Sequence, residues 1–194
     1  MPDAKIADST RIYTGWTSLD RIALVMPDGA VVERHIEDHG GAVALLPYDP
    51  DRRTALLVSM PRAPVVRIGD PDLLEAIAGS LESDEDPEAC ACREALEEAG
   101  LDLDSLELVG RVWSMPGLST ERISLYLAPY SQASRIEAGG GAAGEHENIA
   151  VHEVPLAELW RSAAAGGLPD LKTLALLQAL RIRSPALFAD SDEG

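Results

Sequence analysis

Three glutamates, Glu94, Glu97 and Glu98, lie within five positions of one predicted helix. The chain already has a net charge of −17, and like charges four residues apart destabilise a helix by about 0.2–0.5 kcal/mol. Carboxylate oxygens are, however, the ligands that Mg²⁺ prefers, and proteins often share that ion between a few carboxylates and the phosphates of a substrate. The cluster therefore suggests a metal site, with a solvated helix face as the alternative reading.

The glutamates belong to a longer pattern with fixed spacing. The pattern consists of Gly79, Glu85, Arg93-Glu94, Glu97-Glu98 and Gly100-Leu101. The gaps between these positions are five, seven, two and one residues. A solvated face does not require this spacing. The segment resembles the Nudix box, G-x5-E-x7-R-E-U-x-E-E-x-G-U, and departs from it only at Ala95, where the family usually has a larger aliphatic residue.

The resemblance implies a loop–helix–loop that binds Mg²⁺ or Mn²⁺ and cleaves a nucleoside diphosphate linked to another group. It assigns metal binding to Glu94, Glu98 and the backbone carbonyl of Ala78. It also makes Glu97 and Arg93 catalytic residues, with Glu97 a less certain metal ligand.

A wider likeness, from about Tyr13 to Arg181, is to the ADP-ribose pyrophosphatase and GDP-mannose pyrophosphatase branch of that family. Pro116 matches a proline that marks the branch, and the glycine-rich stretch before residue 142 and the run PLAEL are similar to GDP-mannose members. In the branch a glutamate on a loop after the box serves as the base or as a metal ligand. The likeness implies Glu145 as the base here and Glu147 as a further metal ligand, and the sequence leaves open which of the two is the base. The preceding glycines suit a mobile loop that closes over the substrate, and a polar surface loop is the alternative.

The same likeness implies a set of substrate-binding residues. They are Trp16, Arg34, Arg62, Ser80, Met115, Pro116 and Glu121, with Trp16 stacking on the base in the other subunit of a homodimer. Trp16 could equally be a core or interface aromatic residue, and the arginines could be surface ion-pair partners. Residues 58–79 differ from the usual strand of the branch and are shorter, which leaves the base and the sugar open.

Local signals position the catalytic helix. Asp86 followed by Pro87 starts a helix, and Gly100 can end it in a left-handed conformation. At about 100° per residue, the small and apolar positions 89, 92, 95, 96 and 99 share one face, and the three glutamates share the opposite one. We expect the apolar face to lie on the core.

Apolar runs at 41–47 and 54–60 predict a hairpin in a buried sheet, and residues 106–113, 121–128 and 148–154 are further strand candidates. Residues 11–25 and 30–36 flank Pro27-Asp28-Gly29, a turn sequence, and predict an antiparallel unit. Helices are expected over 155–165 and 168–181. The resulting fold class is mixed α/β: an α/β/α sandwich around a mixed sheet (41–184), an N-terminal antiparallel dimerisation extension (1–40) and a flexible tail (185–194).

Composition restricts the class of protein. A hydrophobic share of 46% with 25% charged residues is ordinary for a globular domain, and there is neither a membrane-span-length apolar run nor a signal-peptide pattern. We therefore expect a cytoplasmic protein. The net charge disfavours nonspecific binding to nucleic acid or anionic membranes. Cys90 and Cys92 fit small core or near-surface residues, and the four histidines lack metal-ligand spacing.

The function expected from the sequence is metal-dependent hydrolysis of a nucleoside diphosphate sugar, of the ADP-ribose or GDP-mannose type, to a nucleoside monophosphate and a sugar phosphate. Two alternatives stay open. One is a hydrolase of nucleoside triphosphates or dinucleoside polyphosphates, against which Pro116 and the N-terminal extension argue. The other is a non-catalytic nucleotide-sugar-binding domain, which would typically lack one of the box glutamates.

Overall fold

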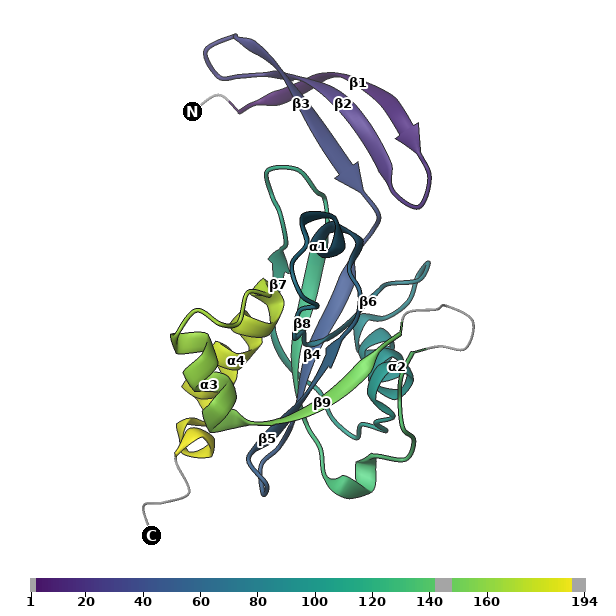
Figure 1. The fold of residues 1–194 in the computed structure, drawn as a ribbon. Coiled ribbons are helices and arrows are strands. Elements are labelled where there is room, and N and C mark those ends of the chain that lie inside the picture. The colour runs from purple at the N-terminus through teal and green to yellow at the C-terminus, as the bar shows by residue number, and fades with distance from the viewer. Residues whose placement is uncertain (1–2, 142–147, 190–194) are drawn as a thin grey trace. The chain divides into compact units, whose positions relative to one another are not determined.

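A computed structural model of the protein describes residues 3–141 and 148–189. The chain forms two compact units: residues 1–42 with 111–123, and residues 43–110 with 124–194. Figure 1 labels their elements. In chain order these are β1 (Lys5–Thr14), β2 (Ser18–Val25), β3 (Val31–Asp38), β4 (Ala42–Asp49), β5 (Thr54–Ser59), α1 (Ala63–Ile68), β6 (Ile77–Ser80), α2 (Pro87–Ala99), β7 (Glu107–Trp113), β8 (Arg122–Pro129), η1 (Gln132–Ser134), β9 (Ala150–Pro155), α3 (Leu156–Ala164), α4 (Leu171–Arg183) and η2 (Pro185–Phe188).

The first unit is built on a three-stranded antiparallel sheet in the order β1-β2-β3. The predicted turn between β2 and β3 is confirmed: the Met26 amide donates to the Ala30 carbonyl at 2.8 Å, and Gly29 has a φ of 86°. The sequence treated residues 11–25 as one run, which was wrong. That run is divided by a turn at residues 15–17, and the strand before the turn begins at Lys5.

The loop between β7 and β8 also belongs to this first unit. The Glu37 amide donates to the Leu118 carbonyl at 2.8 Å, and the Thr120 amide donates to the Glu37 carbonyl at 3.0 Å. These bonds connect β3 with a segment some 80 positions later in the chain, a pairing that no local sequence pattern could predict.

The second unit contains a six-stranded sheet. Its strand order is β7-β8-β4-β5-β9, and β6 pairs with β4. Strands β4 and β5 form the predicted antiparallel hairpin, and β5 is antiparallel to β9. Figure 1 shows α2 on one side of this sheet and α3 with α4 on the other, which confirms the predicted α/β/α architecture.

Both faces of this sheet are buried, as a sheet between two helical layers requires. Alternate residues of β4 and β5 pack toward α2 in a core with Ile77, Cys90, Ala91, Ala95 and Tyr126. The leucines on the opposite face are also buried, as are Leu176, Leu177 and Leu180 of α4. The sheet thus provides a rigid support for α2.

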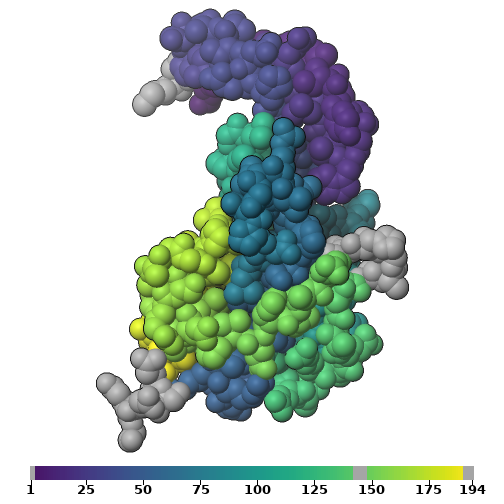
Figure 2. Space-filling view, in the orientation of Figure 1, coloured from purple at the N-terminus to yellow at the C-terminus, as the bar shows by residue number. Residues whose placement is uncertain are grey.

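Two segments differ from the sequence-based expectation. Helix α1 was not predicted; Pro64 lies in its first turn, Gly69 ends it with a φ of 80°, and none of its residues is buried. It lies at the surface of its unit (Figure 2).

Residues 185–188 were expected to be flexible, yet they form η2, and Phe188 is buried with its ring against Trp160. The expectation was wrong because the Phe188 side chain packs against the ring of Trp160.

Among the described residues, no helix has both the length and the apolar character needed to cross a bilayer.

Candidate active site

Helix α2 begins and ends at the predicted residues. The carboxylate of Asp86 accepts hydrogen bonds from the amides of Glu88 (3.0 Å) and Ala89 (3.3 Å), and Pro87 occupies the first helical position. Gly100 ends the helix with a φ of 67°. Because both ends are specified by capping chemistry, the register of the box residues on the helix is set locally.

The buried face of α2 is rotated from the predicted one. The sequence placed residues 89 and 96 on the core side, but both are exposed, whereas Cys90 and Ala91 are buried. Glu98 is only 3% exposed, although the prediction placed it with the other glutamates on the outer face. The apolar pattern is weak because all residues of this helix except Pro87 and Leu96 are small or charged. Packing against the sheet, rather than an apolar stripe, therefore decides which face is inside.

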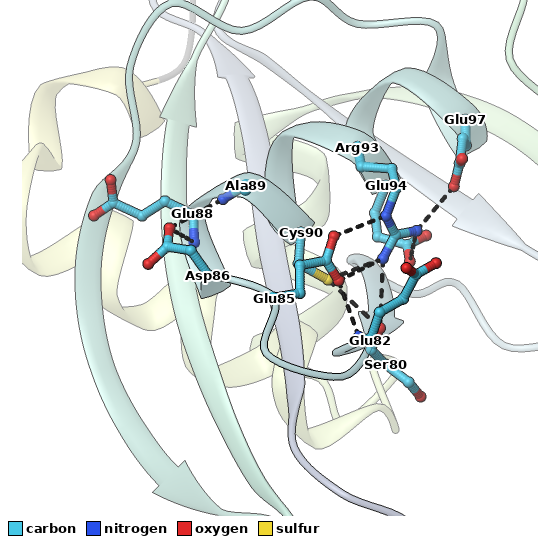
Figure 3. A network of polar contacts seen from close by, with 10 residues as sticks. All are labelled: Ser80, Glu82, Glu85, Asp86, Glu88, Ala89, Cys90, Arg93, Glu94 and Glu97. Atoms are coloured by element: carbon cyan, nitrogen blue, oxygen red, sulfur yellow. Dashed lines mark hydrogen bonds and ion pairs between the residues drawn. The ribbon is translucent and has the colours of Figure 1, made fainter.

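Arg93 lies at the centre of the acidic cluster (Figure 3). Its Nε and Nη2 atoms each donate to Glu85 at 3.0 Å, and its Nη1 donates to Glu94 at 2.7 Å and to Glu97 at 3.0 Å. Arg93 also reaches the backbone carbonyl of Ser80, at 3.5 Å. One guanidinium thus provides the counter-charge for three of the box glutamates, since its planar fork can bind several carboxylates at once.

The electrostatics follow from this geometry. The hydrogen bonds from Arg93 lower the pKa of Glu85 to about 2, and the same bonds raise the pKa of the Arg93 guanidinium. Burial raises the pKa of the neighbouring Cys90 thiol to about 12. Cys90 therefore remains a thiol at neutral pH, which agrees with the predicted structural role.

Strand β6 brings the residues before the box against the helix. A Cβ atom added at Gly79 would overlap the carboxylate of Glu94. Gly79 lies between Ala78 and Ser80 in β6, and only a glycine at this position leaves room for the Glu94 side chain to lie against the strand. Strand β6, which carries the Ala78 carbonyl, and Glu94 are therefore neighbours in the structure. The sequence assigned both to one metal site.

The donor set fits a divalent cation. Glu94, Glu97, Glu98 and a backbone carbonyl offer only oxygen atoms, the ligands that hard cations prefer. Within residues 3–141 and 148–189, no three acidic, histidine or cysteine side chains already converge as a metal site. In the present arrangement Arg93 holds two of the carboxylates. These residues would provide the oxygen ligands for the ion.

The glycine-rich segment after β8 covers the end of α2. The Gly140 amide donates to the Glu98 carbonyl and the Gly141 amide to the Glu97 carbonyl, both at 2.9 Å. A Cβ atom at Gly139 would overlap the Glu98 carbonyl oxygen. These glycines allow close backbone approach to the helix, a role that the sequence did not suggest. The predicted base Glu145 and metal ligand Glu147 lie outside the described residues.

Arg62 forms part of a second charged network in this unit. Its Nε donates to Glu75 at 2.9 Å and its Nη2 at 3.3 Å. Glu75 is only 3% exposed and is also paired with Lys172, which binds Asp170 at 2.9 Å. The buried carboxylate therefore orients a predicted substrate-binding arginine. Sequence reasoning missed Glu75 and Lys172, since their pairing spans 97 positions.

Ser80 ends β6 in the second unit, and the other predicted substrate-binding residues belong to the first unit. Arg34 and Pro116 line one cavity of about 390 Å³, whose apolar wall comes from the three-stranded sheet and Trp113. Met115 and Trp16 are exposed. Glu121 accepts a hydrogen bond from His39, which lies 82 positions earlier in the chain. The sequence assigned His39 no role because the histidines lack metal-ligand spacing.

Comparisons with known proteins agree with the family resemblance of the sequence. The NUDIX domain family matches residues 38–176. The GDP-mannose pyrophosphatase of Cronobacter sakazakii is 39% identical over 164 residues, 82% of this chain and 84% of that protein. The protein of the same name from Klebsiella pneumoniae is 35% identical over 162 residues, with 81% and 80% covered. A crystal structure of an ADP compounds hydrolase superposes with a TM-score of 0.78 at 14% identity, covering 96% of each chain, which shows a shared fold.

Proposed function

Because the chain belongs to the Nudix family, we propose that it hydrolyses the pyrophosphate of a nucleoside diphosphate sugar to a nucleoside monophosphate and a sugar phosphate. One observation carries the proposal. The complete box, from Gly79 to Leu101, gathers Glu85, Glu94 and Glu97 around Arg93 in a chain that is 39% identical to a GDP-mannose pyrophosphatase. GDP-mannose is therefore the first substrate to test.

The chain's own residues supply the binding and orientation. Glu94, Glu98 and the Ala78 carbonyl would hold Mg²⁺ or Mn²⁺, with Glu97 and Glu147 as further ligands. When bound, divalent ions supply charge neutralisation of the pyrophosphate and a lower pKa for the attacking water. Arg93 binds Glu94 and Glu97 through the same Nη1 atom and so fixes both carboxylates, and Glu145 is proposed as the base that accepts the proton from that water.

Arg62 is proposed to contact the phosphates, since a guanidinium suits bidentate phosphate recognition. Glu75 would keep it in place. Trp16 is proposed to stack on the base, and Arg34, Ser80, Met115, Pro116 and Glu121 to complete substrate binding.

We also propose a homodimer whose subunits share the site, with Trp16 contributed by the partner. Strand β1 exposes Ile6, Ile12 and Tyr13, side chains that an interface would cover. Light scattering behind size exclusion would contradict this proposal if it gave the mass of a single 20.7 kDa chain. The cytoplasmic location stays a prediction.

The function is tested by phosphatase-coupled phosphate release. The panel contains GDP-mannose, ADP-ribose, UDP-glucose, a diadenosine polyphosphate and nucleoside triphosphates, each with Mg²⁺, Mn²⁺ or EDTA. We expect metal-dependent turnover of a diphosphate sugar, lost in Glu98→Gln and retained in Glu88→Gln, a matched change at an exposed position of the same helix. Faster turnover of a triphosphate would favour the alternative hydrolase, and binding without monophosphate release would favour a regulatory domain.

A further inference from the structure

His39 is held between two carboxylates in the first unit. Its Nδ1 lies 2.7 Å from Oε1 of Glu37, and its Nε2 lies 3.0 Å from Oε1 of Glu121. The imidazole is largely buried, with 16% of its side-chain surface exposed. Glu37 is fixed in turn by the hydroxyls of Thr17 and Ser119, so the ring has little freedom to rotate.

This geometry requires a charged ring. An ionised carboxylate only accepts hydrogen bonds, and a neutral imidazole has one nitrogen that cannot donate. With a carboxylate at each nitrogen, both must carry a proton. Burial alone lowers the pKa of His39, but the bonds to Glu37 and Glu121 outweigh it and raise the pKa above its ordinary value of 6.5.

Trp16 lies against this imidazolium. Their ring centroids are 5.0 Å apart and the planes differ by 19°. Trp16 is nevertheless 81% exposed, in the turn between β1 and β2, so most of the indole surface remains open. A cation over an indole face is attracted to it, and this stack is the one ring contact found for Trp16 among the residues described.

We propose that His39 is a positioning residue for nucleotide binding: its imidazolium, clamped by Glu37 and Glu121, holds the indole of Trp16 in place to stack on the base of the substrate. This inference rests on the proposed function, because it takes Trp16 as the base-stacking residue. It assigns His39 no contact with the reacting atoms.

Deprotonation of His39 should therefore release Trp16. The charged groups facing the ring are Glu37 from β3 and Glu121 from the loop before β8. Asp38, next along β3, is bound by Thr120 at 2.7 Å. All of these are acids and all favour the proton, so the transition should lie above pH 6.5.

Tryptophan fluorescence tests this without substrate. In a Trp113→Phe, Trp160→Phe background, Trp16 is the only indole, and a protonated imidazole quenches an indole stacked on it. We expect emission to rise in one step as the pH passes the raised pKa of His39. The step should be absent in His39→Gln. In Glu37→Gln its midpoint should fall by about one pH unit, since one of two carboxylate partners is lost.

His35→Gln is the matched control, since His35 is a histidine of β3 only four residues before His39. The step should survive this change. A step that persists in His39→Gln, or that disappears in His35→Gln, would overturn the proposal.

Kinetics with GDP-mannose link the stack to function. At pH 6.5 we expect His39→Gln to raise KM about three- to tenfold, with kcat changed less than twofold because the contact is made equally in the ground and transition states. An unchanged KM would overturn the proposal. If wild-type protein hydrolyses no diphosphate sugar while the His39-dependent step is present, the proposed function fails and the coupling of the two rings stands.

Discussion

The carboxylate of Glu94 lies directly across the α-carbon of Gly79, at a place where any Cβ atom would overlap it. The glycine that begins the box and a glutamate fifteen positions later are thus one structural unit. The spacing between them reflects the close approach of β6 to α2, and the glycine is required for that approach.

Gly79→Ala should therefore displace Glu94 without disturbing the sheet. We expect kcat/KM to fall at least tenfold, equivalent to about 1.4 kcal/mol, with little change in Tm. Gly110→Ala is the matched control in the same unit, since a Cβ atom there meets no neighbour, and its activity should stay within twofold of wild type. Equal activity of the two variants would show that the contact with Glu94 does not matter.

Arg93→Gln should destabilise the protein. It removes the counter-charge of Glu85, Glu94 and Glu97, which we expect to cost about 1–3 kcal/mol of the free energy of unfolding. The loss should be larger in EDTA than in Mg²⁺, because a bound cation replaces part of the missing charge. Urea unfolding measures both values. Arg67→Gln, an exposed change at the end of α1, should cost far less; a similar cost would contradict the central role of Arg93.

Glu75→Gln should affect both stability and substrate binding. Its buried carboxylate binds both Arg62 and Lys172. Removing its charge weakens both ion pairs, which we expect to cost about 1–3 kcal/mol of the free energy of unfolding. Since Arg62 would also lose its orientation, KM should rise more than kcat falls. Glu158→Gln, at an exposed position in the first turn of α3, serves as the comparison. A KM equal to that of wild type in Glu75→Gln would contradict the role of Glu75 in positioning Arg62.

Glu85 should make the protein sensitive to acid. Its pKa is lowered from 4.5 to about 2 by Arg93, so its contribution to stability is present above about pH 4.5 and is lost as the pH falls toward 2. The stability difference between wild type and Glu85→Gln should be greatest at pH 7 and shrink across that window. Denaturant titrations at pH 7, 4 and 3 measure it, and a constant difference would mean that the carboxylate charge is not what Arg93 recognises.

The sequence by itself determined the family, and with it the expected chemistry, and the local structure of the helix that carries the box residues. The box spacing identified the family, and Asp86, Pro87 and Gly100 set the ends of α2, because capping acts between residues a few positions apart. Most strands of the central sheet were also predictable, since their apolar runs and turn residues are local signals.

Tertiary structure decided which side of α2 is buried, because packing against the sheet outweighs a weak apolar pattern made of alanines and cysteines. It also decided the pairings of Glu75 with Lys172 and of His39 with Glu121, which join residues 97 and 82 positions apart. Such contacts depend on how strands and loops come together in space, and no spacing along the chain encodes them. His39 lacked a recognisable motif for this reason, and its clamp became visible only once β3 and the loop before β8 were side by side.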